Sequence, residues 1–312
     1  MVRKILSIDG GGIKGVFPAS FLATIEDSIT GNLSDYFDLI VGTSTGGIIA
    51  LGLGLGLSAK DILGFYEKYG PEIFKGNRFL RLIRQLGFAK YENKKLKQAL
   101  EVIFEGKKLG ESSSRLVIPS VNLENGEVYV YKTAHHDRFQ RDYKEAVINV
   151  ALATSAAPTY FPTHITSSGI PLIDGGIWAN NPMGMAVVEA IGVLGWPKEE
   201  LKVLSLGCTS ESLNINAGRK KALGRIYWSV NIVDVFMTSQ SFASLGTAQL
   251  LAGHKNVIRI NPSVANKRYG LDVVSEIGSL KGLGDAEARK ALPLIKHFFR
   301  KKVEKFDPIY KL

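Results

Sequence analysis

The chain has 312 residues, of which 45% are hydrophobic and one is cysteine. A chain of this length and composition buries a sizeable core, which excludes a disordered protein, and a single cysteine excludes an intrachain disulfide. With 39 basic and 29 acidic residues the formal net charge is +10, which favours an anionic partner. A predicted strand begins almost at the N-terminus, so we expect no signal peptide and a cytoplasmic location.

Strand and helix patterns alternate along the chain. The predicted strands cover residues 4–8, 38–42, 116–122, 127–133, 201–206 and 256–260. The predicted helices cover residues 16–29, 45–55, 59–104, 142–155, 183–194, 228–252 and 285–304. This alternation predicts an α/β fold in three layers, a mostly parallel sheet with helices on both faces. No linker rich in proline or serine interrupts it, so we expect residues 1–312 to form a single domain.

A glycine run, Asp9-Gly10-Gly11-Gly12-Ile13-Lys14-Gly15, follows the first predicted strand and opens a helix. Its glycines also fit the dinucleotide-binding pattern G-x-G-x-x-G, but that pattern requires an acidic residue at the end of the second strand. Here Asp38 lies at the start of that strand. No Lys-Ser or Lys-Thr pair follows the run, which excludes a phosphate-binding P-loop. We interpret the run as a row of backbone N–H groups that can stabilise an oxyanion.

The second motif places Ser44 between a β-branched strand and an apolar helix, in Gly42-Thr43-Ser44-Thr45-Gly46. This is the nucleophile-elbow pattern G-x-S-x-G, in which small residues allow a sharp turn with an exposed serine at its apex. The uncharged stretch 39–59 approaches the length that spans a membrane. Because glycines and the elbow interrupt it, we expect a buried strand and a buried helix instead.

The third motif is Asp174-Gly175-Gly176, which places a carboxylate at the end of another apolar stretch. Taken alone, an Asp-Gly pair is typical of an ordinary turn. A carboxylate beside a serine can nevertheless act as its base if burial raises the pKa of the carboxyl group.

The three motifs in this order, D-G-G-G-x-x-G, G-x-S-x-G and D-G-G, resemble those of the patatin-like phospholipases, and the segment 153–162 is similar to the family's segment before its aspartate. The resemblance implies a patatin-like fold and a phospholipase A that uses a Ser-Asp dyad. In it Ser44 is the nucleophile and Asp174 the base. The glycine-rich loop that forms the oxyanion hole consists of Gly10, Gly11, Gly12 and Gly15, and the supporting glycines are Gly42, Gly46, Gly175 and Gly176. Lys14 departs from the arginine that family members often carry.

The length of the chain and its region 210–312 also resemble the phospholipases of bacterial anti-phage systems, which cyclic nucleotides switch on. This resemblance implies a cyclic dinucleotide activator, membrane phospholipids as substrate, and a location at the inner face of the membrane in antiviral defence. The sequence neither predicts nor excludes a homo-oligomer. Cys208 has no second thiol and the histidines are scattered, so we expect no metal and no cofactor besides the activator.

Two alternatives stay open at this point. A general carboxylesterase would use a triad of Ser44, Asp174 and His254, in the chain order of the α/β-hydrolases. The other histidines, at 135, 136, 164 and 297, fit surface or structural positions better. The second alternative is a non-catalytic α/β protein that binds a nucleotide.

The positive charge is concentrated in residues 75–108, where ten basic residues oppose three glutamates. Arg78, Arg81 and Arg84 recur beside apolar residues at helical spacing, which predicts a basic amphipathic helix. Such a helix either packs on the core with a solvated basic face or docks on anionic lipid headgroups. No nucleic-acid recognition motif accompanies the charge, so we expect no nucleic acid polymer as a partner.

Overall fold

The computed structural model describes residues 1–76, 85, 87–211, 224–264 and 268–312. Its centre is an eight-stranded sheet in the order β5-β6-β3-β2-β1-β7-β9, with β4 paired to β3. The strands are β1 (Arg3–Ile8), β2 (Leu39–Gly42), β3 (Arg115–Asn122), β4 (Val128–Lys132), β5 (His164–Ile165), β6 (Pro171–Asp174), β7 (Leu201–Leu206) and β9 (Val257–Ile260). A separate two-stranded sheet pairs β8 (Ser210–Glu211) with β10 (Ser263–Val264).

Five neighbouring strands of the large sheet, β3, β2, β1, β7 and β9, run parallel. Their carboxyl ends therefore meet at one edge, which is where α/β proteins bind and transform ligands. β4 and β6 are antiparallel to β3. Each predicted strand is confirmed to within one residue at either end, whereas β5, β6, β8 and β10 were not predicted as strands.

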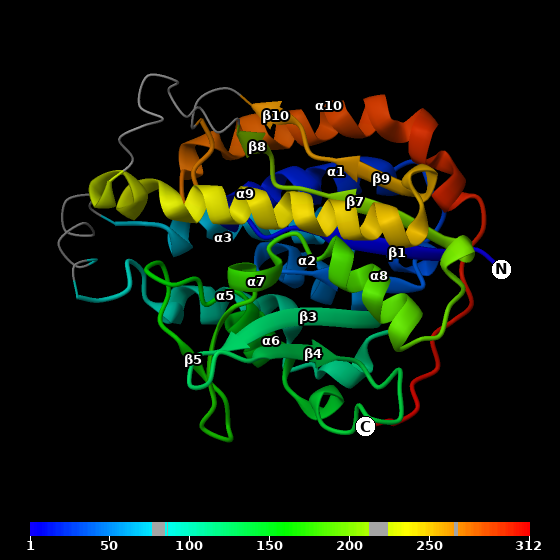
Figure 1. Ribbon diagram of the computed structural model, residues 1–312, viewed down its shortest axis with the longest axis horizontal. Helices are drawn as coiled ribbons and strands as arrows, with labels where there is room; N and C mark the ends of the chain where they lie inside the picture. The colour runs from blue at the N-terminus through cyan, green and yellow to red at the C-terminus, as the bar shows by residue number, and fades with distance from the viewer. Residues whose placement is uncertain (77–84, 86, 212–223, 265–267) are drawn as a thin grey trace.

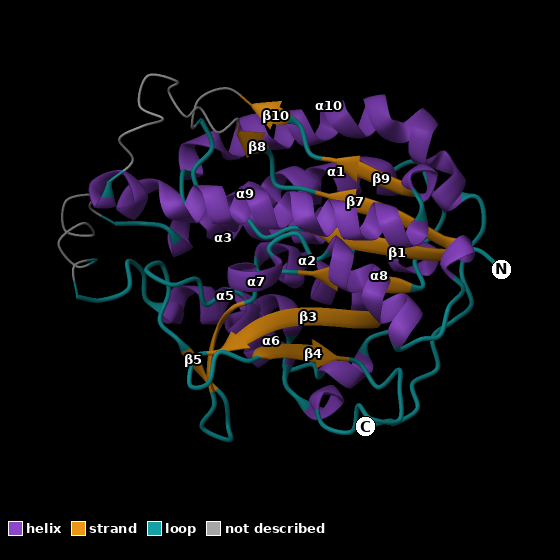
Figure 2. Cartoon of the chain, in the orientation of Figure 1, coloured by secondary structure: helices purple, strands orange, loops and turns teal. Residues whose placement is uncertain are grey.

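Helices cover both faces of the sheet, which confirms the predicted three layers (Figures 1 and 2). One face packs against α8 (Met183–Gly192) and the C-terminal part of α9 (Arg225–Ala252). Behind the sheet lie α1 (Val16–Glu26), α2 (Thr45–Gly54), α3 (Ala59–Ile73), α5 (Asn93–Phe104), α6 (Val147–Thr154) and α10 (Ile277–Ile295). A short helix, α7 (Gly176–Ala179), follows β6. The stretch 39–59 forms buried β2 and α2, as predicted, and within the described chain no helix is long and apolar enough to cross a membrane.

The C-terminal helix differs from the prediction of 285–304. It begins eight residues earlier, as α10, and a short 3-10 helix, Lys296–Phe299, ends it. Three glycines in the first eight residues of α10 disfavour a helix in isolation. A methyl group at Gly284 would lie 2.6 Å from the carbonyl oxygen of Phe17, so the glycine lets α10 pack closely on α1. This tertiary contact overrides the weak propensity.

The predicted helical stretch 59–104 is wrong as one element, because α3 ends at Ile73 and α5 begins at Asn93. Residues 87–92 between them form turns and bends. Arg78, Arg81 and Arg84, which we predicted to form a basic amphipathic helix, lie outside the described residues.

Candidate active site

The register of the sheet brings Ser44 and Asp174 together at the carboxyl edge. Val41 of β2 pairs with Val117 of β3, and Ser44 follows the end of β2 at the carboxyl edge of the sheet. Further along β3, Ser120 pairs with Asp174 at the end of antiparallel β6. Two motifs 130 residues apart therefore meet across one strand.

Ser44 occupies a strained turn between β2 and α2. Its φ of 54° and ψ of −122° lie in a region that residues with a side chain rarely adopt and that costs about 1–3 kcal/mol. A methyl group at Gly46 would collide with the carbonyl oxygen of Ile8, and one at Gly42 would collide with the backbone of Gly46. The glycines of this motif thus allow α2 to start directly against β1, which holds the turn in its strained form.

A hydrogen bond from α6 fixes the backbone of this elbow. The backbone N–H of Ser44 donates to Oγ1 of Thr154 at 3.0 Å, and the Thr154 hydroxyl donates to the carbonyl oxygen of Pro119 at 2.6 Å. Thr154 is fully buried, so no water competes for these bonds. Sequence reasoning missed this residue, because a threonine at the end of an apolar helix carries no distinctive signal.

Asp174 is buried and faces the serine. Its Oδ1 accepts the backbone N–H of Gly176 at 2.7 Å, and the nearby Ser44 hydroxyl also favours the charged form of the carboxylate. Burial raises the pKa of Asp174 to about 6, although the Ser44 hydroxyl and the Gly176 N–H both favour the charged form. A carboxylate with this pKa is ionised at neutral pH and yet basic enough to accept a proton from a bound hydroxyl.

The glycine loop that follows β1 lies directly beside Ser44. A methyl group at Gly10 would lie 3.2 Å from Cβ of Ser44 and would collide with the side chain of Asn180. The backbone N–H of Gly10 donates to the carbonyl oxygen of Asn180 at 2.9 Å, so this amide is engaged within the protein. Gly10 therefore positions the loop, and its own N–H does not point to a ligand.

The next two amides of the loop differ from Gly10. In the part of the chain that the structure describes, no acceptor is found for the backbone N–H of Gly11 or of Gly12. Gly12 has a φ of +58°, which favours glycine, and the following amide, that of Ile13, donates to the carbonyl oxygen of Leu271 at 2.8 Å. Two adjacent N–H groups beside a serine can bind a developing oxyanion.

The remaining motif glycines lie at close contacts around the site. A methyl group at Gly15 would collide with the side chain of Thr45, and one at Gly175 would collide with the carbonyl oxygen of Pro119. A methyl group at Gly176 would lie 3.0 Å from Oδ1 of Asp174. These contacts bring the first turns of α1 and α7 against the elbow and against β3.

A buried ion pair supports the base of the glycine loop. Nη1 of Arg259, in β9, donates to Oδ1 of Asp9 at 2.7 Å, and Nη2 pairs with Oδ2. Nη1 also donates to Oγ of Ser205 at 2.7 Å. The pair fixes the end of β1 to the edge strand across β7. The sequence marks Asp9 as part of a motif, but nothing near Arg259 marks it as the partner.

Polar side chains of α9 hold the loop that follows Asp174. Oε1 of Gln240 accepts the backbone N–H of Asn180 at 2.7 Å, and Nε2 of Gln240 donates to the carbonyl oxygen of Ile177 at 3.1 Å. One turn later, Oγ of Ser244 donates to the carbonyl oxygen of Asn181 at 2.7 Å. We name this set of contacts the α9 clamp. It fixes the segment that carries Asp174 at one end and contacts Gly10 at the other.

His254 and His135 lie away from this site. His254 is exposed in a short helix just before β9, at the amino edge of the parallel strands and opposite Ser44, so the triad alternative is wrong. His135 is buried, and its Nε2 lies 3.0 Å from Oε1 of Glu189, which also binds Lys132. That histidine is structural, as expected.

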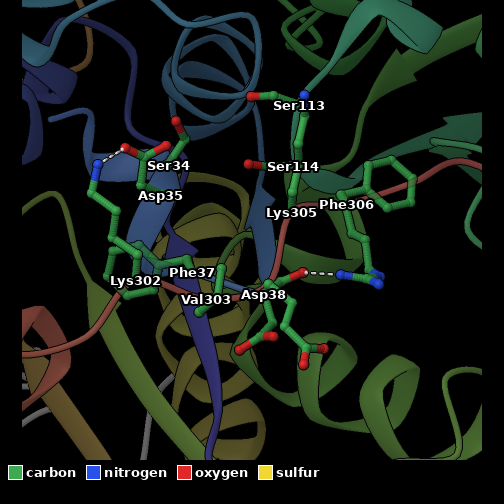
Figure 3. A pocket seen from close by; sticks show the side chains of 12 residues that line it. Ser34, Asp35, Phe37, Asp38, Ser113, Ser114, Lys302, Val303, Lys305 and Phe306 are labelled. Carbon is green, nitrogen blue, oxygen red and sulfur yellow. Dashed lines mark hydrogen bonds and ion pairs between the residues drawn. The ribbon is translucent and has the colours of Figure 1, made fainter.

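Among the described residues, no cluster of three or more histidine, cysteine or acidic side chains could hold a metal ion. A cavity of about 270 Å³ lies at the amino edge of the sheet, whereas Ser44 lies at the carboxyl edge. Figure 3 shows the side chains that line it. Three basic side chains line it (Arg115, Lys302 and Lys305), together with three carboxylates (Asp35, Asp38 and Glu304). Because these charges balance, the cavity does not favour an anionic ligand.

Comparison with known proteins identifies the family. A family model described as patatin-like phospholipase matches residues 6–187. A cGAMP-activated phospholipase of Pseudomonas aeruginosa is 32% identical over 307 residues, which cover 94% of this chain and 91% of that protein. A protein of Vibrio cholerae with the same name is 32% identical, with coverages of 92% and 88%, and patatin-like protein 2 of Arabidopsis thaliana is 30% identical, with coverages of 92% and 83%. The chain belongs to the patatin-like phospholipases, and it is a lipid acyl hydrolase.

Proposed function

We propose that this protein cleaves acyl esters of membrane phospholipids with a dyad of Ser44 and Asp174. Oγ of Ser44 attacks the ester carbonyl carbon while its proton passes to the Asp174 carboxylate. The carbonyl oxygen becomes an oxyanion, to which the N–H groups of Gly11 and Gly12 donate. When the tetrahedral intermediate collapses, Asp174 returns the proton to the leaving alkoxide, and a lysophospholipid departs.

The second half of the reaction repeats these steps with water. Asp174 accepts a proton from a water molecule, whose oxygen attacks the acyl-enzyme carbonyl. The same two amides hold the second oxyanion. Its collapse releases the fatty acid, and the proton on Asp174 restores the Ser44 hydroxyl.

One observation carries this proposal: Asp174 is buried beside the Ser44 hydroxyl, and its pKa is raised to about 6. A general base works best when its pKa lies near the working pH, because it is then ionised and still basic. The two amides of the glycine loop for which the described residues provide no acceptor support it, as does the strained turn that aims Ser44.

The names of two relatives support a proposal about regulation. Two proteins that match more than nine tenths of this chain are named cGAMP-activated phospholipases, so we propose a cyclic dinucleotide as the activator here too. An enzyme that is switched on in this way and degrades membrane lipid fits antiviral defence at the inner face of the membrane. A single domain over residues 1–312, a homo-oligomer, the absence of a cofactor, and docking through Arg78, Arg81 and Arg84 all stay predictions.

Fatty acid release from phospholipid mixed micelles, with and without cGAMP, tests the proposal. Ser44→Ala and Asp174→Asn should each lower the rate by about 10³ or more, as in other serine hydrolases. Two exposed residues of the same types supply matched controls, Ser168→Ala and Asp137→Asn, which should keep full activity.

The two parts of the proposal fail separately. Equal rates with and without cGAMP would end the regulatory part and leave the chemistry in place. Substantial turnover by folded Ser44→Ala protein would refute the nucleophile. No hydrolysis under either condition, together with cGAMP binding, would favour the alternative of a non-catalytic nucleotide-binding protein.

A further inference from the structure

We infer that exposed apolar side chains around the active site form the surface on which this protein contacts a lipid bilayer. This inference rests on the proposed function, because it assigns the surface that delivers the lipid. We name this surface the apolar rim. It comprises the side chains of Ile177, Ile232, Val233, Phe236 and Leu271, which are between 37% and 64% exposed.

On one side, the apolar rim continues directly from the α9 clamp. Gln240 binds the backbone of Ile177, three residues after Asp174. Phe236 and Val233 precede Gln240 by one and two helical turns, on the same face of α9, so they lie about 6 and 10 Å further along the helix axis. In Figure 1 this half of α9 extends past the carboxyl ends of β1 and β7, the edge where Ser44 lies. Apolar side chains therefore flank the site next to its carboxylate.

On the other side, Leu271 borders the glycine loop. Its carbonyl oxygen accepts the N–H of Ile13, and a methyl group at Gly12 would collide with its backbone. Its side chain is 37% exposed. The apolar rim thus borders both the carboxylate and the amides that we assign to the oxyanion.

The composition of α9 favours a bilayer as the occupant of this surface. Between residues 226 and 252 the sequence has one charged residue, Asp234. Large exposed apolar side chains that gather in one place mark an interaction surface, and an apolar helix face beside polar groups is suited to the membrane interface. Ser44 is only 9% exposed, so a second protein copy on the apolar rim would close the route to it. A bilayer on the same surface would instead supply the substrate there.

The test compares two changes on one helix. Val233→Ser combined with Phe236→Ser removes the centre of the apolar rim. Leu250→Ser is the matched control, because Leu250 is 83% exposed on the same helix but near its C-terminal end, beside the amino edge of the sheet. Each full-length protein is assayed with cGAMP present for flotation with vesicles of phosphatidylethanolamine and phosphatidylglycerol, for hydrolysis of those vesicles, and for hydrolysis of a soluble short-chain ester.

The double variant should float with vesicles, and hydrolyse them, at least tenfold less than the wild type, since it no longer buries two large apolar side chains at the bilayer. Its rate on the soluble ester should stay unchanged, and Leu250→Ser should match the wild type in every assay. Unchanged flotation, an equal loss from Leu250→Ser, or equal losses on both substrates would overturn the inference. So would a wild-type dimer that the double variant dissociates without losing vesicle binding. Failure of the proposed function differs from all of these, because the wild type would then hydrolyse neither substrate whether or not it floats.

Discussion

Replacing Asp174 by asparagine should remove activity and at the same time stabilise the fold above neutral pH. Asp174 has a pKa of about 6 in the folded protein, against an ordinary value of 3.8, because burial disfavours its charge. The folded state therefore binds more protons than the unfolded state between these two values, and stability is lost as the pH rises through that window. A difference of about two pKa units corresponds to roughly 3 kcal/mol at pH 8. Asparagine avoids that cost and keeps the acceptor oxygen for Gly176.

Thermal unfolding as a function of pH measures this effect. At pH 8, Asp174→Asn should be more stable than the wild type by roughly 1–3 kcal/mol, which raises the midpoint by about 2–6 °C in a chain of this size. The advantage should shrink toward pH 4, where the wild-type carboxyl group is protonated. Ser44→Ala is the matched control, since it is expected to be equally inactive but keeps the carboxylate, so its midpoint should not rise. A lower midpoint for Asp174→Asn at every pH would refute the reasoning and make Asp174 a structural acceptor.

The other predictions concern protonation, the buried ion pair and the histidine alternative. Hydrolysis of a soluble ester should fall tenfold per pH unit below about pH 6, because Asp174 must be ionised to accept a proton, and a flat profile down to pH 4.5 would contradict this role. Arg259→Ala should lower the free energy of unfolding in urea by roughly 3–5 kcal/mol, because it leaves Asp9 buried without its counter-charge. A loss below about 1 kcal/mol would instead mean that water reaches Asp9. His254→Ala should keep the rate of ester hydrolysis within about twofold, since His254 is exposed at the opposite edge of the sheet, and a loss as large as that of Ser44→Ala would reinstate the triad.

Local sequence patterns were enough to predict the central strands and the proximity of Ser44 to the glycine loop, for physical reasons. A β-branched run that ends in Gly-x-Ser-x-Gly can form little except a strand, a turn and a helix, because only glycine fits the contacts at Gly42 and Gly46. Parallel strands place their carboxyl ends at one edge, so Ser44 and the loop at Gly10 had to be neighbours once the alternation was recognised.

The supporting residues could not be predicted, because their partners are distant in the chain. Arg259 is an arginine in an apolar strand, and only the sheet order places it against Asp9, 250 residues away. Gln240 and Thr154 have no local feature that distinguishes them from other polar residues on helices. The start of α10 was missed because the local sequence is misleading there. Its glycines disfavour a helix, but the contact with α1 stabilises one.

The contacts between the motifs and the last hundred residues limit how far the chain can be shortened. The family match ends at residue 187, but Gln240, Arg259 and Leu271 all lie beyond it and hold Asn180, Asp9 and Ile13 in place. A fragment cut at the end of that match would keep every motif in its sequence. It would also expose the edge of β1 that pairs with β7, and it would leave the Asp9 carboxylate without the guanidinium of Arg259. The functional unit for expression, crystallisation or transfer into another protein is therefore longer than the region by which the family is recognised.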